Sequence, residues 1–261
     1  MSAKYNRIGK NYNQTRKADP YLAIRMIHHL QPQTGKNYLD IGCGTGNYTH
    51  KISQAGGVFM GVDPSQRMLD AARERHPQIK WQLGTAENLP MEDESVDGVI
   101  ASLTLHHWED LEKGFKELQR VLKPEGKIVI FTSTPEQMEG YWRNQYFPQM
   151  MKDSCHQMPT EEDVRSAALK GGFALQKREI YEIRPDLQDG FLYVGKHEPQ
   201  RYLDPQLRKG ISSFSALAHQ EEVKQGLQDL QKDIESGAIR NVMASFDHQK
   251  GDYLFIIAKK S

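Results

Sequence analysis

A glycine-rich segment near the start of the chain has the residue types that hold a nucleotide-like ligand. Residues 38–46 read YLDIGCGTG. A short apolar run that contains the carboxylate of Asp40 is followed by three glycines at alternate positions. Glycines let the backbone adopt positive φ and approach a ligand closely. A loop of this kind at the carboxyl end of a strand is a typical cofactor site. The carboxylate of Asp40 would repel a pyrophosphate and favour a cationic ligand.

A second carboxylate, Asp63, lies 23 positions after Asp40 at the end of the next apolar run. A carboxylate about 20 residues after such a loop binds ribose hydroxyls in dinucleotide-binding proteins. The alternative is a helix N-cap, since Pro64 follows directly. Asn47 stands where a dinucleotide fingerprint requires Gly or Ala. A nicotinamide-dependent oxidoreductase therefore stays an alternative, disfavoured by Asn47 and by the position of Asp40.

These residues must be positioned by the surrounding strands and helices. Strand-like and helix-like segments alternate along residues 20–132, which indicates a parallel sheet with crossover helices. Asp19 is expected to cap a first helix that has Pro20 in its first turn. Hydrophobic runs bounded by turn residues predict strands over 37–41, 58–62, 80–83, 96–101, 127–132, 174–181 and 253–259.

The second half of the chain has a different pattern. Thr160 and Asp163 resemble a capping box, which opens a helix that ends at Gly171. Residues 186–237 are expected to be mainly helical. Residues 138–151 contain four aromatic residues and three methionines. This segment is either an additional core helix or a substrate-facing lid, because methionine and aromatic rings suit both roles.

Four segments in this order resemble the class I S-adenosylmethionine-dependent methyltransferases, in particular the small-molecule subgroup called type 11, which includes quinone-biosynthesis C-methyltransferases. They are residues 39–46 (LDIGCGTG), 62–65 (VDPS), 84–90 (GTAENLP) and 120–126 (RVLKPEG). The resemblance implies a Rossmann-like α/β sheet of seven mostly parallel strands, the last antiparallel, with helices on both faces and a helical, aromatic cap. We expect one domain over 1–261, with cofactor-covering helices in 1–35, a cofactor-binding core in 36–132 and cap insertions in 133–159 and 186–250.

The implied function is transfer of the methyl group of S-adenosylmethionine to a small-molecule acceptor by direct displacement, with S-adenosylhomocysteine as product. A non-catalytic protein that binds or senses S-adenosylmethionine is an alternative. The implied cofactor-binding residues come from the N-terminal arm, the glycine-rich loop and the ends of the next strands. They are Tyr5, Tyr12, Arg16, Asp40, Gly42, Cys43, Gly44, Gly46, Asp63, Pro64, Met68, Thr85, Ala86, Glu87, Leu103 and His106. Thr85 stands where many members have aspartate, so a carboxylate contact to the adenine amino group is not expected.

His106 and His107 are candidates for a general base, because imidazole titrates near neutral pH; the alternative is a structural wall of the pocket. Adjacent histidines on an extended segment point to opposite sides, and no metal site is predicted. The predicted acceptor-binding residues are Trp108, Tyr141, Trp142 and Tyr146.

The charge balance limits the partners. The chain has 34 basic and 34 acidic residues, which argues against general attraction to nucleic acid or membrane. Residues 1–38 nevertheless carry a net charge of +6 (7 minus 1), which fits an arm that meets the cofactor carboxylate and an acceptor that is hydrophobic or anionic. Two cysteines and no long apolar segment predict a cytoplasmic protein without membrane insertion.

Overall fold

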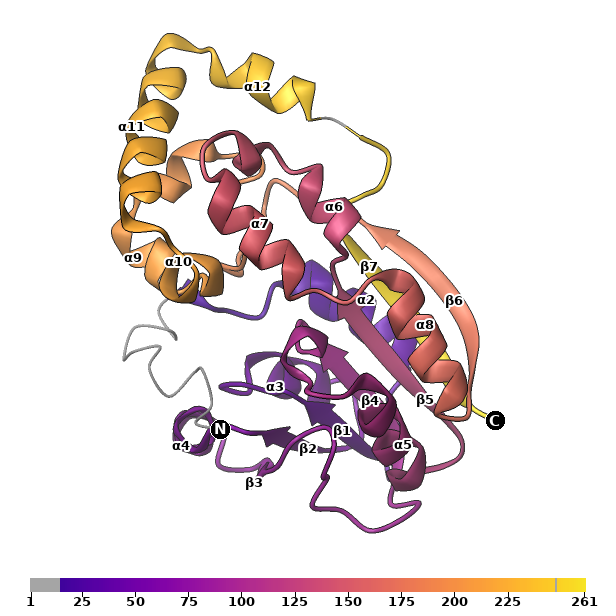
Figure 1. Cartoon of the computed structure of the whole chain (residues 1–261). Coiled ribbons are helices and arrows are strands. Elements are labelled where there is room, and N and C mark those ends of the chain that lie inside the picture. Colours follow the sequence, from indigo (N-terminus) through magenta and orange to yellow (C-terminus); the bar gives the residue numbers. More distant parts are fainter. Residues whose placement is uncertain (1–14, 247) are drawn as a thin grey trace.

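The computed structural model describes residues 15–246 and 248–261. Its centre is a seven-stranded sheet with the order β3-β2-β1-β4-β5-β7-β6 (Figure 1). The strands are β1 (Asn37–Ile41), β2 (Val58–Asp63), β3 (Lys80–Leu83), β4 (Val96–Ser102), β5 (Leu122–Thr132), β6 (Phe173–Tyr181) and β7 (Tyr253–Lys260). The first five pair in parallel, and β7 is antiparallel to both β5 and β6. The predicted Rossmann-like sheet is thereby confirmed.

Helices cover both faces of the sheet (Figure 1). Side chains of α2 (Pro20–Leu30) and α3 (Asn47–Ser53) share one apolar cluster with alternate residues of the central strands. Side chains of α5 (Leu111–Val121) and α8 (Glu161–Lys170) form the cluster on the opposite face. A third, smaller cluster joins α4 (Gln66–Arg75) to Trp81 of β3. The period-two strand pattern thus buries both faces, as a parallel sheet requires.

Short-range chemistry fixes two helix starts where the sequence predicts them. The side chain of Asp19 accepts a 2.8 Å hydrogen bond from the backbone N–H of Leu22, and Pro20 occupies the first turn of α2. Thr160 and Asp163 form the expected capping box at the start of α8. Each cap satisfies backbone donors that the first helical turn leaves without partners.

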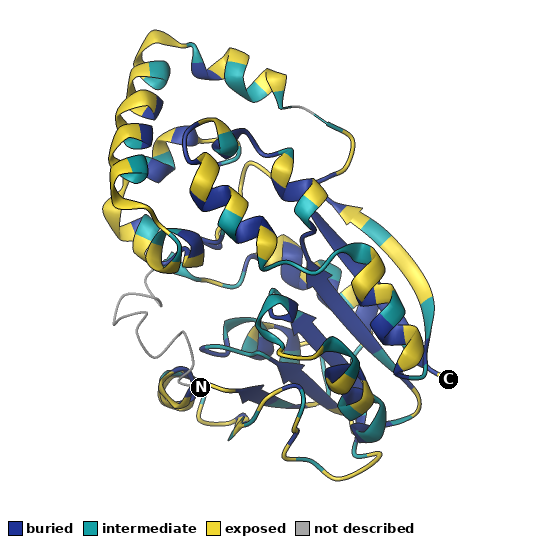
Figure 2. Cartoon of the chain, in the orientation of Figure 1, coloured by how far each residue is buried: buried dark blue, intermediate teal, exposed yellow. Residues whose placement is uncertain are grey.

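Two long insertions form a cap over the carboxyl edge of the sheet (Figure 1). One insertion follows β5 and the other follows β6; because both strands are antiparallel to β7, they end at the same edge. The cap elements are α6 (Pro135–Glu139), η3 (Trp142–Gln145), α7 (Pro148–His156), η4 (Pro199–Leu203), α9 (Pro205–Lys209), α10 (Ser212–Ala216), α11 (Gln220–Ser236) and α12 (Ile239–Ser245). Most of α11 is exposed on the outside (Figure 2).

The expectation of helix over residues 186–237 is wrong at its start. Residues 182–198 form turns and extended chain without a helix. Gly190 lies where a β-carbon would be 2.5 Å from the carbonyl oxygen of Thr15, and Gly195 where one would be 2.4 Å from the ring of Tyr202. The chain here passes closely over its neighbours, and this tertiary packing overrides the helical spacing of the sequence.

Candidate functional site

The glycine-rich loop connects β1 to α3, and each of its three glycines has positive φ. A β-carbon on Gly42 would lie 2.1 Å from the hydroxyl of Thr104, and one on Gly46 would lie 2.3 Å from the indole of Trp81. Gly44 differs, because no atom of residues 15–246 and 248–261 lies within 4 Å of the β-carbon position. Gly42 and Gly46 therefore allow close packing of the protein on itself, whereas Gly44 leaves open space above the loop.

Asp40 lies at the end of β1 directly below this loop and is almost fully buried. Its carboxylate accepts a 2.6 Å hydrogen bond from the hydroxyl of Thr49 on α3. Burial raises the pKa of Asp40 to about 7, with a smaller contribution from the negative charge of Asp63 and an opposing one from the bond to Thr49. Within residues 15–246 and 248–261, no cation forms an ion pair with Asp40. A cation above the loop would stabilise the ionised form.

Asp63 ends β2 and turns back toward the glycine-rich loop. One carboxylate oxygen accepts the N–H of Gly44 at 2.9 Å, and the other accepts the N–H of Ser65 at 2.8 Å. The N-cap of α4 is Ser65, whose hydroxyl accepts the N–H of Met68. Asp63 is thus not a helix cap. Burial raises its pKa, and the two N–H donors oppose that shift.

The side chain of Cys43 lies beneath the loop, where its sulfur would be 2.8 Å from a β-carbon at Gly61. Burial raises the pKa of this thiol well above its usual value, and the negative charges of Asp40 and Asp63 add smaller effects in the same direction. A thiol held neutral is a weak nucleophile. Cys43 therefore packs the loop against the sheet.

The residues predicted for the adenine side lie in different environments. Met68 and Ala86 are buried, and Ala86 belongs to the apolar cluster beneath α5. Thr85 and Pro64 are exposed. Glu87 accepts the backbone N–H groups of Glu109 and Asp110 at 2.8 and 3.4 Å. The carboxylate of Glu87 is therefore engaged in fixing the loop before α5.

The segment after β4 corrects one expectation. Residues Leu105–His107 form a turn of 3-10 helix, and the ring centroids of His106 and His107 lie 3.9 Å apart. The prediction that they point to opposite sides is wrong, because Leu103, which has φ of 51°, turns the chain out of the extended conformation. Among the described residues, no group of three or more His, Cys, Asp or Glu side chains is arranged to hold a metal ion.

Three of the four predicted acceptor-binding residues are buried, and the fourth, Trp108, is half-buried. Trp108 contacts Phe115 of α5, with ring centroids 5.7 Å apart. Tyr141 shares a 2.5 Å hydrogen bond with the hydroxyl of Tyr202, and the indole of Trp142 donates to the carbonyl of Lys196. Tyr146 donates to Asp233 of α11 at 2.7 Å.

The last three of these residues hold η3 against the second insertion, and all three are buried. Their environment agrees with an additional core segment, the first of the two interpretations of residues 138–151.

The N-terminal arm is described from Thr15 onward, so Tyr5 and Tyr12 lie outside the described residues. Arg16 lies beside the glycine-rich loop, where its carbonyl accepts a 3.0 Å hydrogen bond from Asn47. Its guanidinium forms an ion pair with Asp189 of the cap at 2.6 Å. Sequence reasoning identified neither Asp189 nor Thr49 and Tyr48 of α3. Thr49 and Tyr48 closely follow the glycine motif, and this proximity was the only signal.

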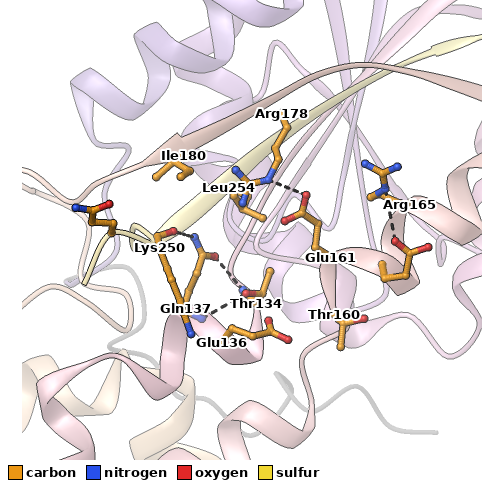
Figure 3. A pocket seen from close by; sticks show the side chains of 12 residues that line it. Thr134, Glu136, Gln137, Thr160, Glu161, Arg165, Arg178, Ile180, Lys250 and Leu254 are labelled. Atoms are coloured by element: carbon orange, nitrogen blue, oxygen red, sulfur yellow. Dashed lines mark hydrogen bonds and ion pairs between the residues drawn. The ribbon is translucent and has the colours of Figure 1, made fainter. Parts of the chain in front are cut away.

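A hollow of about 610 Å³ lies elsewhere, between the first turns of α6 and α8 and the strands β6 and β7 (Figure 3). Arg178 of β6 and Glu161 of α8 form a 2.7 Å ion pair in its wall. Among the described residues that line it, none belongs to the predicted cofactor or acceptor set. No helix in the described part of the chain is long and apolar enough to cross a membrane.

The sheet order, the crossover helices and a glycine-rich loop between two buried carboxylates define a Rossmann-like α/β protein, a class whose members typically bind a cofactor at this edge of the sheet. Comparison with known proteins makes the class specific. The model of the methyltransferase domain family matches residues 39–130. A crystal structure from Anabaena variabilis, described as that of a "putative methyltransferase from antibiotic biosynthesis pathway", is 34% identical, with a TM-score of 0.82 over 94% of this chain and 98% of that one. The chain therefore belongs to the class I S-adenosylmethionine-dependent methyltransferase family.

Curated relatives are similar over shorter parts of their length. The biotin biosynthesis bifunctional protein BioHC of Cellvibrio japonicus is 28% identical over 87% of this chain and 47% of its own. The malonyl-[acyl-carrier protein] O-methyltransferase of Erwinia pyrifoliae is 31% identical over 51% of each chain. The chain thus spans about half the length of the curated relatives it matches, and the similarity to the second is limited to about half of this chain.

Proposed function

We propose that the chain transfers the methyl group of S-adenosylmethionine to a small-molecule acceptor by direct displacement. The observation that carries this proposal is the pair of buried carboxylates, Asp40 and Asp63, on either side of a loop with open space above Gly44. Two buried carboxylates without an ion-pair partner among the described residues favour a ligand that brings positive charge. The cofactor carries an ammonium group and a sulfonium, and it has no phosphate.

The residues present fit this cofactor. Asp40 and the backbone of the glycine-rich loop would hold the methionine part, and the open space over Gly44 leaves room for it. Asp63 would accept hydrogen bonds from the ribose hydroxyls, because each of its oxygens accepts one backbone N–H from the described residues and has a second acceptor site. Met68 and the Thr85–Ala86 segment would flank the adenine. A nicotinamide dinucleotide fits less well, since its pyrophosphate would meet Asp40.

When bound, S-adenosylmethionine supplies an electrophilic methyl group with a good leaving group. The chain's own task is to orient the acceptor atom in line with the carbon–sulfur bond and to exclude water. Such alignment supplies about 7–11 kcal/mol in well-oriented systems. A general base adds roughly 10²–10⁴-fold, and His106 and His107 are the residues proposed to receive an acceptor proton or to shape that wall of the site.

The cap supports an acceptor of limited size, because both insertions lie over the carboxyl edge where the cofactor would bind (Figure 1). The relative that methylates a malonyl group carried by an acyl carrier protein suggests carboxylic acids and acyl thioesters as one acceptor class to test. The proposed localisation is cytoplasmic, which rests on the sequence expectation.

Isothermal titration calorimetry and thermal shift with S-adenosylhomocysteine and NADH test the cofactor. We expect S-adenosylhomocysteine to bind and raise Tm. The variants Gly44→Asp and Asp63→Ala should lose this binding, while Asp70→Ala, which removes an exposed carboxylate of α4, should keep it. Stabilisation by NADH alone, or unchanged affinity in the first two variants, would overturn the assignment.

Methyl transfer from labelled S-adenosylmethionine to a panel of carboxylic acids, thioesters, phenols, amines and thiols then tests activity. Tight binding without turnover on any class would favour the non-catalytic alternative.

A further inference from the structure

A buried ion pair between residues far apart in the chain joins the cap to the N-terminal arm beside the glycine-rich loop. Asp189 lies in the irregular segment after β6, and its side chain is 1% exposed. The guanidinium of Arg16 donates to its two oxygens from Nε at 2.6 Å and from Nη2 at 3.2 Å. This side-on, two-bond geometry fixes the plane of the guanidinium as well as its distance.

Tyr48 connects this pair to the helix that follows the glycine-rich loop. Its hydroxyl donates to Asp189 at 3.1 Å and accepts the backbone N–H of Asp19 at 3.2 Å. Asn47, the neighbouring residue of α3, donates to the carbonyl of Arg16 at 3.0 Å. Asn47 and Tyr48 are the first two residues of α3, directly after Gly46.

A second connection runs through the segment that carries Asp189. The backbone N–H of Gly190 donates to the carbonyl of Thr15 at 2.9 Å, and that of Gln188 donates to the carboxylate of Asp19 at 3.1 Å. Three parts of the chain therefore meet at one point: the arm at residues 15–19, the start of α3, and the cap at residues 188–190.

Removal of the Asp189 carboxylate from this cluster would take away the acceptor shared by Arg16, Tyr48 and the backbone N–H of Lys17. Burial raises the pKa of its carboxyl group, while Arg16, Tyr48 and the backbone N–H of Lys17 oppose that shift, so the ionised form depends on these three partners. A buried charge of this kind persists only with its partners in place. The cap segment and the start of α3 therefore hold their positions together.

We propose that Asp189 is a positioning residue that couples the position of the cap to the conformation of the glycine-rich loop. The inference rests on the proposed function, since the coupled site is the one assigned to S-adenosylmethionine. By thermodynamic reciprocity, cofactor bound at the loop stabilises the seated cap to the same degree that the seated cap strengthens cofactor binding. Methyl transfer would benefit, because the seated cap lies over the carboxyl edge of the sheet, where the acceptor must be aligned (Figure 1).

The test compares Asp189→Asn with Asp186→Asn, a matched change in the same segment at an exposed carboxylate paired with Arg184. Calorimetry measures the affinity for S-adenosylhomocysteine, and hydrogen–deuterium exchange measures protection of residues 186–216 with and without it. In the wild type we expect the ligand to slow exchange in this segment. Asp189→Asn should weaken binding by roughly 5–150-fold, the usual range of coupling between sites, and should abolish the added protection. Asp186→Asn should change neither.

Tyr48→Phe serves as a second variant, because it removes one hydrogen bond to Asp189 and keeps the ring. It should shift both measurements in the same direction by a smaller amount, and it tests the inference if Asp189→Asn fails to fold. A lower Tm with wild-type affinity and wild-type ligand-induced protection would mean that Asp189 is merely structural, and would overturn the inference alone. Failure of the wild type to bind S-adenosylhomocysteine would overturn the proposed function, and this inference with it.

Discussion

The hydroxyl of Thr49 on α3 donates a 2.6 Å hydrogen bond to the carboxylate of Asp40 on β1, and both residues are buried. This bond favours the ionised carboxylate, whereas burial and Asp63 favour the protonated one, and burial dominates. The pKa of Asp40 is therefore about 7 in the protein without ligand. The charge below the glycine-rich loop changes within the physiological pH range.

The first prediction concerns the pH dependence of cofactor binding. S-adenosylhomocysteine keeps the ammonium group of the cofactor, and this group needs ionised Asp40, so the affinity should fall as pH decreases below about 7, approaching about tenfold per pH unit. Thr49→Val removes the bond that favours ionisation and should move this midpoint to higher pH. Asp40→Asn should bind about 10–100-fold more weakly at pH 8, given the value of a hydrogen bond to a charged group, and should lose the pH dependence. Calorimetry between pH 5.5 and 8.5 checks this; a flat profile in the wild type would contradict it.

The second prediction separates two glycines of the same loop. Gly46→Ala brings a β-carbon within 2.3 Å of the indole of Trp81, which is itself held by a hydrogen bond to the carbonyl of His76. This variant should lose roughly 2 kcal/mol or more of unfolding free energy from strain and overpacking. Gly44→Ala meets no atom in the described part of the chain and should cost only about 1 kcal/mol of backbone strain.

The affinity for S-adenosylhomocysteine should show the opposite order, because the methyl group of Gly44→Ala projects into the space proposed for the ligand. Chemical denaturation and calorimetry on the two variants measure both quantities. The idea fails if Gly44→Ala binds the ligand as tightly as the wild type.

The third prediction concerns acid stability. His29 of α2 is buried against Phe255 and Glu179, while its neighbour His28 is exposed. Burial lowers the pKa of His29, and Glu179 only partly offsets the effect. A histidine whose pKa is lower in the folded state contributes stability above its unfolded pKa of about 6.5, and this stability decreases as pH falls below that value.

His29→Gln should therefore reduce the loss of Tm between pH 7 and pH 5, and His28→Gln should leave the wild-type slope unchanged. Thermal unfolding at a series of pH values gives the comparison. Identical slopes for the wild type and His29→Gln would show that the acid sensitivity comes from other groups.

The fourth prediction concerns a buried cation of the cap. The guanidinium of Arg143 is fully buried, donates to the carbonyl of Leu192 and to Ser213, and lies over the ring of Phe214 at 4.8 Å. Within the described ranges it has no carboxylate partner, and its Nε has no hydrogen-bond acceptor. Arg143 therefore contributes to the stability of the cap mainly through the packing of its planar guanidinium group.

Arg143→Met keeps most of the volume and removes the buried charge, so its unfolding free energy should stay within about 1.5 kcal/mol of the wild type. Arg143→Lys keeps a charge that is more strongly hydrated and cannot stack, and it should lose roughly 3 kcal/mol. Urea denaturation of both variants provides the test, and a lysine variant more stable than the methionine variant would refute the packing role.

The parts of the site that the sequence pattern predicts are those governed by neighbours in the chain. Asp40 is the penultimate residue of β1, and Asp63 is the last residue of β2. Parallel strands bring their carboxyl ends to one edge, so the meeting of these residues at the glycine-rich loop follows from the order of elements. The caps at Asp19 and Thr160 need only the next three residues. The confirmed sheet follows for the same reason, because each strand has its own hydrophobic period.

The parts that it misses depend on partners far away in the chain. Asp189 lies 173 positions from Arg16, and Tyr202 lies 61 positions from Tyr141. No spacing rule relates such residues, because side-chain direction in an irregular segment is set by packing. Glu87 illustrates the same limit: its position in a family motif says nothing about the two N–H groups of the next loop that its carboxylate accepts.

The antiparallel strand β7 also has a consequence for how the protein is made and modified. β7 lies between β5 and β6 in the sheet, but it comes last of the three in the chain. During synthesis, β6 has no strand to pair with until residues 253–260 emerge. The sheet is therefore assembled out of chain order through long-range contacts, and sheets that depend on such contacts fold slowly. A tag or truncation that disturbs β7 would unpair β6 as well, and the second insertion of the cap would lose both of its anchors at once.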